Sequence, residues 1–237
     1  MRVLTVRTER EKLGQVAELD QLKKFARSTN LVINRRLGQL STWVESEGQT
    51  YYNFHHKRRL GLKFDGDSWN LQRISAENAV NPLFFEHLCV GALTADKVGM
   101  RYYGEYSIFL RPDAFEHRST VFEENPFSFA KKFSVAAGEM PPHGFRAPWS
   151  ARALLVEAKL GGKLVSGMTE EQIKALILAP ERGDSDCDFI EVHIYGSLHV
   201  SAMARVVGPK PKQPTDKIIW DRLSAKLNEL GTEVIEE

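Results

Sequence analysis

The chain has 237 residues, of which 42% are hydrophobic and 27% are charged, and its formal net charge is +1 at pH 7. This length and composition are those of an ordinary globular protein with room for one large domain or two small ones. A net charge so close to zero produces no global field that would favour nucleic acid or a membrane surface.

The start of the chain and its hydropathy indicate where the protein resides. The first segment, MRVLTVRTEREK, lacks the apolar run of a signal peptide, and no stretch approaches the roughly 18 apolar residues that a membrane span needs. The two cysteines, Cys89 and Cys187, lie far apart, which suits a reducing compartment and argues against a disulfide framework. We expect a soluble, cytoplasmic protein without a membrane partner, or one delivered by a route that uses no N-terminal signal peptide.

Residues 1–48 are expected to form a helical N-terminal region. Thr8 and Glu11 have the spacing of a capping box, and apolar residues then recur at helical spacing from Leu13 to Ala26. A second helix is predicted from Leu31 to Glu47, because apolar residues again recur on one face.

The remaining residues, 49–237, are expected to form an α+β domain. The segment 105–112 has the pattern of a strand that stops at Pro112. The segment 125–149 is rich in glycine, proline and aromatic residues and is interpreted as a long, partly ordered loop.

Helices and strands are predicted for the last third of the chain as well. Thr169 caps a helix, strands follow at 188–195 and 199–207, and a last helix runs from Thr215 to Leu230. The strand 188–195 is expected to be central and to pair with 105–111 or with the strand that follows it. The predicted fold class is therefore α+β, with a helical N-terminal region followed by a mixed, mainly antiparallel sheet and flanking helices.

The stretch CDFIEVHIYG, residues 187–196, has two different faces if it forms a strand. One face is β-branched and apolar, with Ile190, Val192 and Ile194. The other places the carboxylate of Glu191 beside the imidazole of His193, about 6 to 7 Å apart along the strand, so that both can converge on one ligand. A surface strand with one polar face is the alternative interpretation.

A second group of charged side chains lies in the stretch 51–63. Three aromatic residues precede the sequence HHKRR, whose cations are Lys57, Arg58 and Arg59. Basic residues interleaved with aromatic ones are typical of surfaces that bind single-stranded nucleic acid. A solvated helix end explains the same pattern.

The histidines do not form a recognisable metal motif. The chain has seven of them, without HExxH spacing and without a cysteine pair to help. A site assembled from Glu191, His193 and His143 is not required by any spacing, so we expect no metal. A P-loop, a GxGxxG turn and a GxSxG elbow are also absent from the sequence, which argues against a Walker-type NTPase, a Rossmann dehydrogenase and an α/β-hydrolase.

Four short segments together resemble a group of toxin-type ADP-ribosyltransferase-like domains, which occur in bacterial polymorphic toxins and phage-associated proteins. The matching segments are Tyr103-Gly104-Glu105, Leu110-Arg111-Pro112, Arg118-Ser119-Thr120-Val121-Phe122, and Phe189-Ile190-Glu191 through Ile194-Tyr195-Gly196. They cover about a tenth of the chain, and their order and spacing carry the resemblance. It places an ADP-ribosyltransferase-like core at 99–208.

The resemblance implies an NAD-dependent effector or toxin that modifies a macromolecule. Glu191 is then the catalytic carboxylate that holds the nicotinamide ribose and stabilises the positive charge that develops as nicotinamide leaves, with His193 beside it. The implied residues for binding NAD as co-substrate are Tyr102, Tyr103, Arg118, Ser119 and Thr120. Two alternatives stay open, namely a nucleic-acid-binding protein or nuclease that uses 51–63, and a catalytically silent binding module on the same scaffold.

Overall fold

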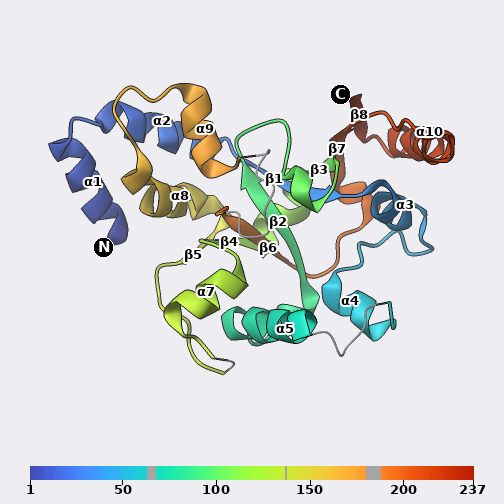
Figure 1. Cartoon of the computed structure of the whole chain (residues 1–237), viewed down its shortest axis with the longest axis horizontal. Helices are drawn as coiled ribbons and strands as arrows, with labels where there is room; N and C mark the ends of the chain where they lie inside the picture. Colours follow the sequence, from blue (N-terminus) through green and yellow to red (C-terminus); the bar gives the residue numbers. More distant parts are fainter. Residues whose placement is uncertain (63–67, 137, 180–187) are drawn as a thin grey trace.

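The computed structural model describes residues 1–62, 68–136, 138–179 and 188–237, so Lys63 and Cys187 lie outside the described residues. Within these ranges α-helices flank a single eight-stranded sheet (Figure 1), which confirms the predicted α+β class. The strands are β1 (Asn30–Arg35), β2 (Leu88–Thr94), β3 (Tyr106–Leu110), β4 (Ser119–Phe122), β5 (Arg146–Pro148), β6 (Glu191–Tyr195), β7 (Met203–Gly208) and β8 (Glu233–Glu236). The α-helices are α1 (Arg2–Lys12), α2 (Val16–Arg27), α3 (Leu37–Glu45), α4 (Phe54–Arg59), α5 (Ser68–Val80), α6 (Pro112–Phe115), α7 (Pro126–Phe133), α8 (Arg152–Leu160), α9 (Glu170–Ile177) and α10 (Pro214–Glu229).

No helix in these described ranges has both the length and the apolar character that a membrane crossing requires.

The sheet has the strand order β5-β4-β6-β2-β1-β3-β7-β8, and its pairs are antiparallel except for β7 with β8. The strand β6 is internal, as predicted, but its neighbours are β2 and β4. The predicted pairing with 105–111 or with the following strand is wrong, because β3 and β7 pair with each other beyond β1. Alternation along a strand reveals which face is buried but carries no information about the neighbouring strand.

The N-terminal region is mostly helical, as expected, but two of its details differ from the prediction. Residues 31–35, predicted to begin a helix, belong instead to β1, which lies in the interior of the sheet between β2 and β3. Sheet pairing on both sides overrides the helical spacing there. Thr8 lies inside α1 rather than at a helix start, and the chain turns at Gly14, whose φ of 67° is favourable for glycine.

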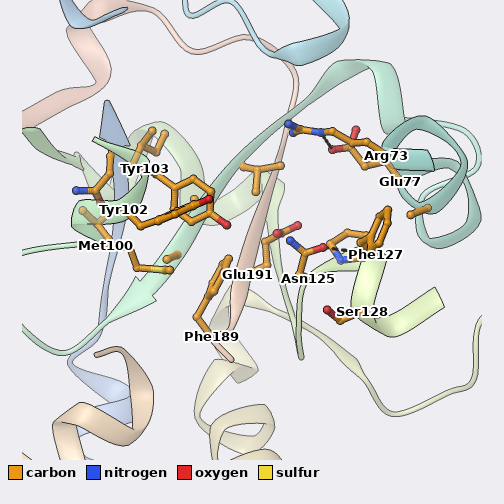
Figure 2. A pocket seen from close by; sticks show the side chains of 18 of the residues that line it. Arg73, Glu77, Met100, Tyr102, Tyr103, Asn125, Phe127, Ser128, Phe189 and Glu191 are labelled. Carbon is orange, nitrogen blue, oxygen red and sulfur yellow. Dashed lines mark hydrogen bonds and ion pairs between the residues drawn. The ribbon is translucent and has the colours of Figure 1, made fainter. Parts of the chain in front are cut away.

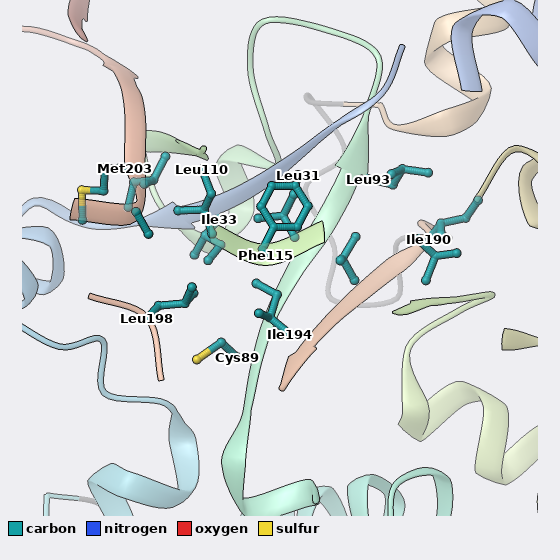
Figure 3. Close-up of a cluster of buried hydrophobic side chains, with 14 of the residues drawn as sticks. Leu31, Ile33, Cys89, Leu93, Leu110, Phe115, Ile190, Ile194, Leu198 and Met203 are labelled. Atoms are coloured by element: carbon teal, nitrogen blue, oxygen red, sulfur yellow. The ribbon is translucent and has the colours of Figure 1, made fainter. Parts of the chain in front are cut away.

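One face of the sheet carries the main hydrophobic core (Figure 3). Ile190, just before β6, and Val192 and Ile194 of β6 point to this face and are completely buried. Figure 3 shows Ile190 and Ile194 among side chains from other strands. The helices α2, α3, α8, α9 and α10 cover this face, because each contributes residues to the same cluster. The apolar face predicted from the sequence is therefore confirmed.

The opposite face of the sheet is filled differently, by two small apolar clusters. One contains Val32, Met100 and Phe189, and the other joins Val80 at the end of α5 to Phe122 and Phe129. The helices α5 and α7 lie together below the sheet in Figure 1. Because neither cluster spans the whole face, space is left between them, and Glu191 on the polar face of β6 borders this space.

The segment 125–149, predicted as a loop, is in part regular. Asn125 caps the N-terminus of α7 by accepting a hydrogen bond from the backbone of Phe127, and Pro126 occupies the first turn. Residues 146–148 form β5 and pair with β4. Proline at the first helical position favours a helix start, so the composition that suggested a loop is compatible with this arrangement.

Truncation of the apolar face of β6 should destabilise the fold. We expect Ile194→Ala to lower the free energy of unfolding by about 2 to 5 kcal/mol, because it leaves a cavity in a packed core, as measured by urea denaturation. Ile218 of α10 is 69% exposed, so the same substitution there should change the free energy by only about 0.5 kcal/mol. Equal costs at the two positions would show that the β6 face is not the core.

Candidate functional site

A pocket of about 330 Å³ lies on the second face of the sheet, over β1, β2 and β6. This volume lies at the lower end of the range for small-molecule sites. Figure 2 shows Glu191 between two groups of side chains. On one side are Tyr102, Tyr103 and Phe189, and on the other are Arg73, Glu77, Asn125 and Phe127.

Different parts of the chain supply the walls of this pocket. Tyr102 and Tyr103 come from a short 3-10 helix, η2 (Arg101–Tyr103), just before β3. The rings of Tyr103 and Phe189 lie edge to face, with centroids 6.3 Å apart. Opposite them the rings of Trp69 and Phe127 are 5.0 Å apart, which joins α5 to α7. The pocket therefore has aromatic walls on both sides of a carboxyl group.

Glu191 is 4% exposed and faces the pocket from β6. In the register of the sheet it lies opposite Ala92 of β2 and Phe122 of β4, so its neighbours on both sides are apolar. Burial raises the pKa of Glu191 to about 8, and the carboxylate of Glu77 contributes in the same direction. At neutral pH the side chain is therefore mainly the uncharged acid.

His193 contacts Glu191 directly on the same face of the strand. Its Nε2 atom is 2.7 Å from Oε1 of Glu191, and its ring stacks on Phe122 with centroids 5.4 Å apart. Burial lowers the pKa of His193 well below its ordinary value, and the charge of Arg146 lowers it further. At neutral pH the two groups therefore form a hydrogen bond between an uncharged carboxyl and an uncharged imidazole, rather than an ion pair.

A second carboxylate in the pocket wall is ionised instead. Glu77 of α5 is 2.7 Å from Nε of Arg73 and 2.5 Å from Nε2 of His55. Burial alone would raise the pKa of Glu77, but the charge of Arg73 and the hydrogen bond from His55 outweigh it and lower the pKa. The pocket thus contains one acid that keeps its proton and one that has lost it, which is the pattern of acid and base groups in many active sites.

The structure brings together only part of the predicted site. Glu191, Tyr102 and Tyr103 line one pocket, and His193 touches Glu191. Thr120 of β4 lies opposite His193 in the register of the sheet and therefore on the same face. Its hydroxyl accepts a hydrogen bond of 2.8 Å from Arg146.

Three of the residues assigned to NAD by the resemblance, Arg118, Ser119 and Thr120, are not among those that line the pocket. Ser119 lies opposite Ile194 in the register, which places it on the main core face. Arg118 donates hydrogen bonds to the backbone oxygens of Ala114, Tyr195 and Ser197. A segment of alternating residues cannot present neighbouring positions to the same face, and this limits how much of the R-S-T motif can contact a ligand.

The basic residues of the stretch 51–63 lie on the short helix α4, which buries some of their side chains and exposes others. His55 points inward to Glu77 and is buried, whereas Arg59 lies 3.7 Å from Glu86 and is half exposed. Lys57 and Arg58 follow His55 on the same helix. His55 therefore lies behind the pocket, where it contacts Glu77, a residue of the pocket wall.

In the ranges given above, the structure holds no group of three or more histidine, cysteine, aspartate or glutamate side chains arranged to bind a metal ion. Of the three residues considered for such a site, His143 is exposed in the segment before β5, while Glu191 and His193 are buried.

Among the residues of the site that were not identified from the sequence are Arg73, Glu77, Asn81 and Arg146. Arg73 and Glu77 are four residues apart on a helix, a spacing that allows the ion pair to be anticipated. Asn81 and Arg146 reach His193 only through the tertiary fold, at 112 and 47 residues' separation. No local pattern in the sequence reports such contacts.

The sequence matches no protein-family model and no curated protein.

The protonated carboxyl of Glu191 should be detectable in the pH dependence of stability. Its pKa is about 8 in the folded chain against an ordinary value of 4.5, so between these values the folded state holds a proton that the unfolded state has lost. The contribution of Glu191 to stability is therefore complete below about pH 4.5 and is lost as the pH rises through about 8. Urea unfolding across this range should show the loss in the native chain and not in Glu191→Gln.

Glu229 is an exposed residue of α10 and provides the matched control. The variant Glu229→Gln should keep the pH dependence of the native chain. If the native chain and Glu191→Gln lose stability in parallel, Glu191 is ionised in the folded state and the uncharged pair does not exist.

Proposed function

We propose that the chain is an NAD-using ADP-ribosyltransferase-like enzyme, an effector or toxin that transfers ADP-ribose to a macromolecule. The observation that carries the proposal is the position of Glu191, a buried carboxyl on the floor of a pocket with aromatic walls. A strand-borne glutamate is the residue that the motif resemblance assigns to catalysis. Tyr102 and Tyr103, assigned to NAD by the same resemblance, line the same pocket.

The aromatic side chains and the carboxyl group of the pocket suit the nicotinamide end of NAD. The aromatic side chains Tyr103 and Phe189 can pack against a planar nicotinamide ring. A cationic ring beside Glu191 favours the ionised carboxylate, because an opposite charge within about 4 to 6 Å lowers the pKa of an acid. Binding of NAD should therefore displace the proton of Glu191 into solvent.

The proposed reaction breaks the bond between C1′ of the ribose and the nicotinamide nitrogen. The electron pair of that bond leaves with nicotinamide, and positive charge develops on the ribose. The Glu191 carboxylate accepts a hydrogen bond from the ribose 2′-hydroxyl and stabilises this charge in a site that excludes water. A nucleophile of the target then forms the new bond to C1′ and gives its proton to solvent.

Substitution of the carboxyl should test this function directly. We expect Glu191→Gln to keep the fold and to lower the rate of nicotinamide release by about 10²-fold or more, the usual cost of losing an electrostatic partner of the transition state. At NAD concentrations well below saturation, the native rate should increase as the pH rises toward about 8, where Glu191 of the free chain ionises, and the rate of the variant should not. The measurement is incubation with labelled NAD and a cell lysate, with Glu229→Gln as the control.

Other outcomes of this experiment separate the alternatives. NAD binding by calorimetry without nicotinamide release at any pH would make the chain a catalytically silent binding module. Absence of NAD binding, together with retention on single-stranded nucleic acid that weakens steeply with salt, would favour the nucleic-acid alternative. In that case, neutralisation of Lys57, Arg58 and Arg59 should flatten the salt dependence.

A further inference from the structure

The imidazole of His193 is surrounded by hydrogen-bond donors at one of its two nitrogens. Its Nδ1 atom lies 2.9 Å from Nη1 of Arg146 and 3.2 Å from Nδ2 of Asn81. A guanidinium group has only N–H donors and no acceptor. Nδ1 must therefore accept, and it cannot carry a hydrogen of its own in this arrangement.

The acceptor role of Nδ1 also determines whether the other ring nitrogen, Nε2, carries a hydrogen. A neutral imidazole has one nitrogen with hydrogen and one without, so the hydrogen of His193 is on Nε2. That atom donates to Oε1 of Glu191 over 2.7 Å. We propose that Arg146 is a positioning residue, which holds His193 as the neutral Nε2–H tautomer and thereby directs the second oxygen of Glu191 into the pocket. The role of that oxygen in the reaction rests on the proposed function; the tautomer does not.

The consequence for Glu191 is a difference between its two oxygens. Oε1 is occupied by His193, whereas Oε2 has no hydrogen-bond partner among the residues that the structure describes. Because Glu191 lines the pocket, Oε2 is the atom that can offer a proton or a lone pair to a ligand. If the tautomer were reversed, Nε2 would be an acceptor, and the carboxyl proton would be directed to His193 instead.

Arg146 is itself held firmly in place. Nη1 also donates to Oγ1 of Thr120 over 2.8 Å and lies 3.2 Å from the hydroxyl of Tyr195, while Nη2 donates to the backbone oxygen of Val80. Its Cζ atom lies 4.7 Å above the ring of Phe122. The guanidinium is thus fixed by contacts with β4, β6 and α5.

The charged and titratable groups that face the pair come from four elements. They are Arg146 of β5, Tyr195 of β6, and Arg73 and Glu77 of α5, with His55 of α4 behind Glu77. Arg146 is the one among them that contacts His193 with a positive charge. It therefore disfavours the imidazolium form as well as the Nδ1–H tautomer.

The first test uses the native chain without any ligand. Two-dimensional NMR of the imidazole nitrogens at pH 7 should show His193 Nε2 with a hydrogen and Nδ1 without one. An Nδ1–H tautomer or an imidazolium at this pH would overturn the proposal, whatever the chain does with NAD.

The second test removes the donor with Arg146→Met. Asn81 is then the remaining polar group beside Nδ1 in the described part of the chain, and its amide can turn to present its oxygen to the ring. We therefore expect Nδ1 of His193 to acquire a hydrogen at pH 7 and nicotinamide release to fall roughly 10- to 100-fold, the usual cost of removing a group that orients a working side chain. Arg152→Met is the matched control, because Arg152 also lies over an aromatic ring, Trp149, and donates to a backbone oxygen. The control should leave both the His193 nitrogens and the rate unchanged.

An Arg146→Met variant whose His193 nitrogens match the native ones would contradict the positioning role. If the variant does not fold, the native NMR measurement still decides the tautomer. If the nitrogens behave as expected but Glu191→Gln has no effect on NAD turnover, the proposed function fails while the positioning role of Arg146 stands.

Discussion

The burial of Glu191 against His193 is the constraint on which the rest of the site depends. Two ionisable groups without access to water are tolerated only if they are hydrogen-bonded or uncharged. Here both conditions hold, because the pair shares a hydrogen bond and burial keeps each member neutral. The surrounding contacts from Arg146 and Asn81 complete the hydrogen bonding of the imidazole, and an apolar ring, Phe122, covers one side of it.

The strand β6 serves stability with one face and the pocket with the other. Its β-branched side chains pack into a large core beneath five helices. Because such an interior is close-packed, the strand can shift very little, and the position of Glu191 is fixed. A site on an internal strand is held more rigidly than one on a loop. The incomplete apolar filling of the second face leaves room for a ligand beside the same strand.

The sequence allowed the faces of β6, the α+β class and the cap of α9 at Thr169 to be predicted, because these follow from periodicity and local hydrogen bonding. It did not allow the neighbours of each strand to be predicted, and it did not reveal that residues 30–35 form an interior strand. The carboxyl and imidazole were identified as neighbours from their spacing alone. Arg146 was missed because its role arises from a contact between β5 and β6 through β4, which no local pattern encodes. The position of Ser119 on the core face was not anticipated, because a motif names residues without stating which face of the sheet they occupy.

The place of β6 between β2 and β4 has a consequence for the order in which the chain folds. Its two neighbours end at residues 94 and 122, whereas β6 begins at residue 191, so during synthesis both are made long before the strand that joins them. Until it arrives, β2 and β4 each present an open edge, which is a template for pairing with other chains. Pairings between such distant segments also close slowly. The interval before β6 inserts is therefore when the newly made chain is most exposed to misassembly.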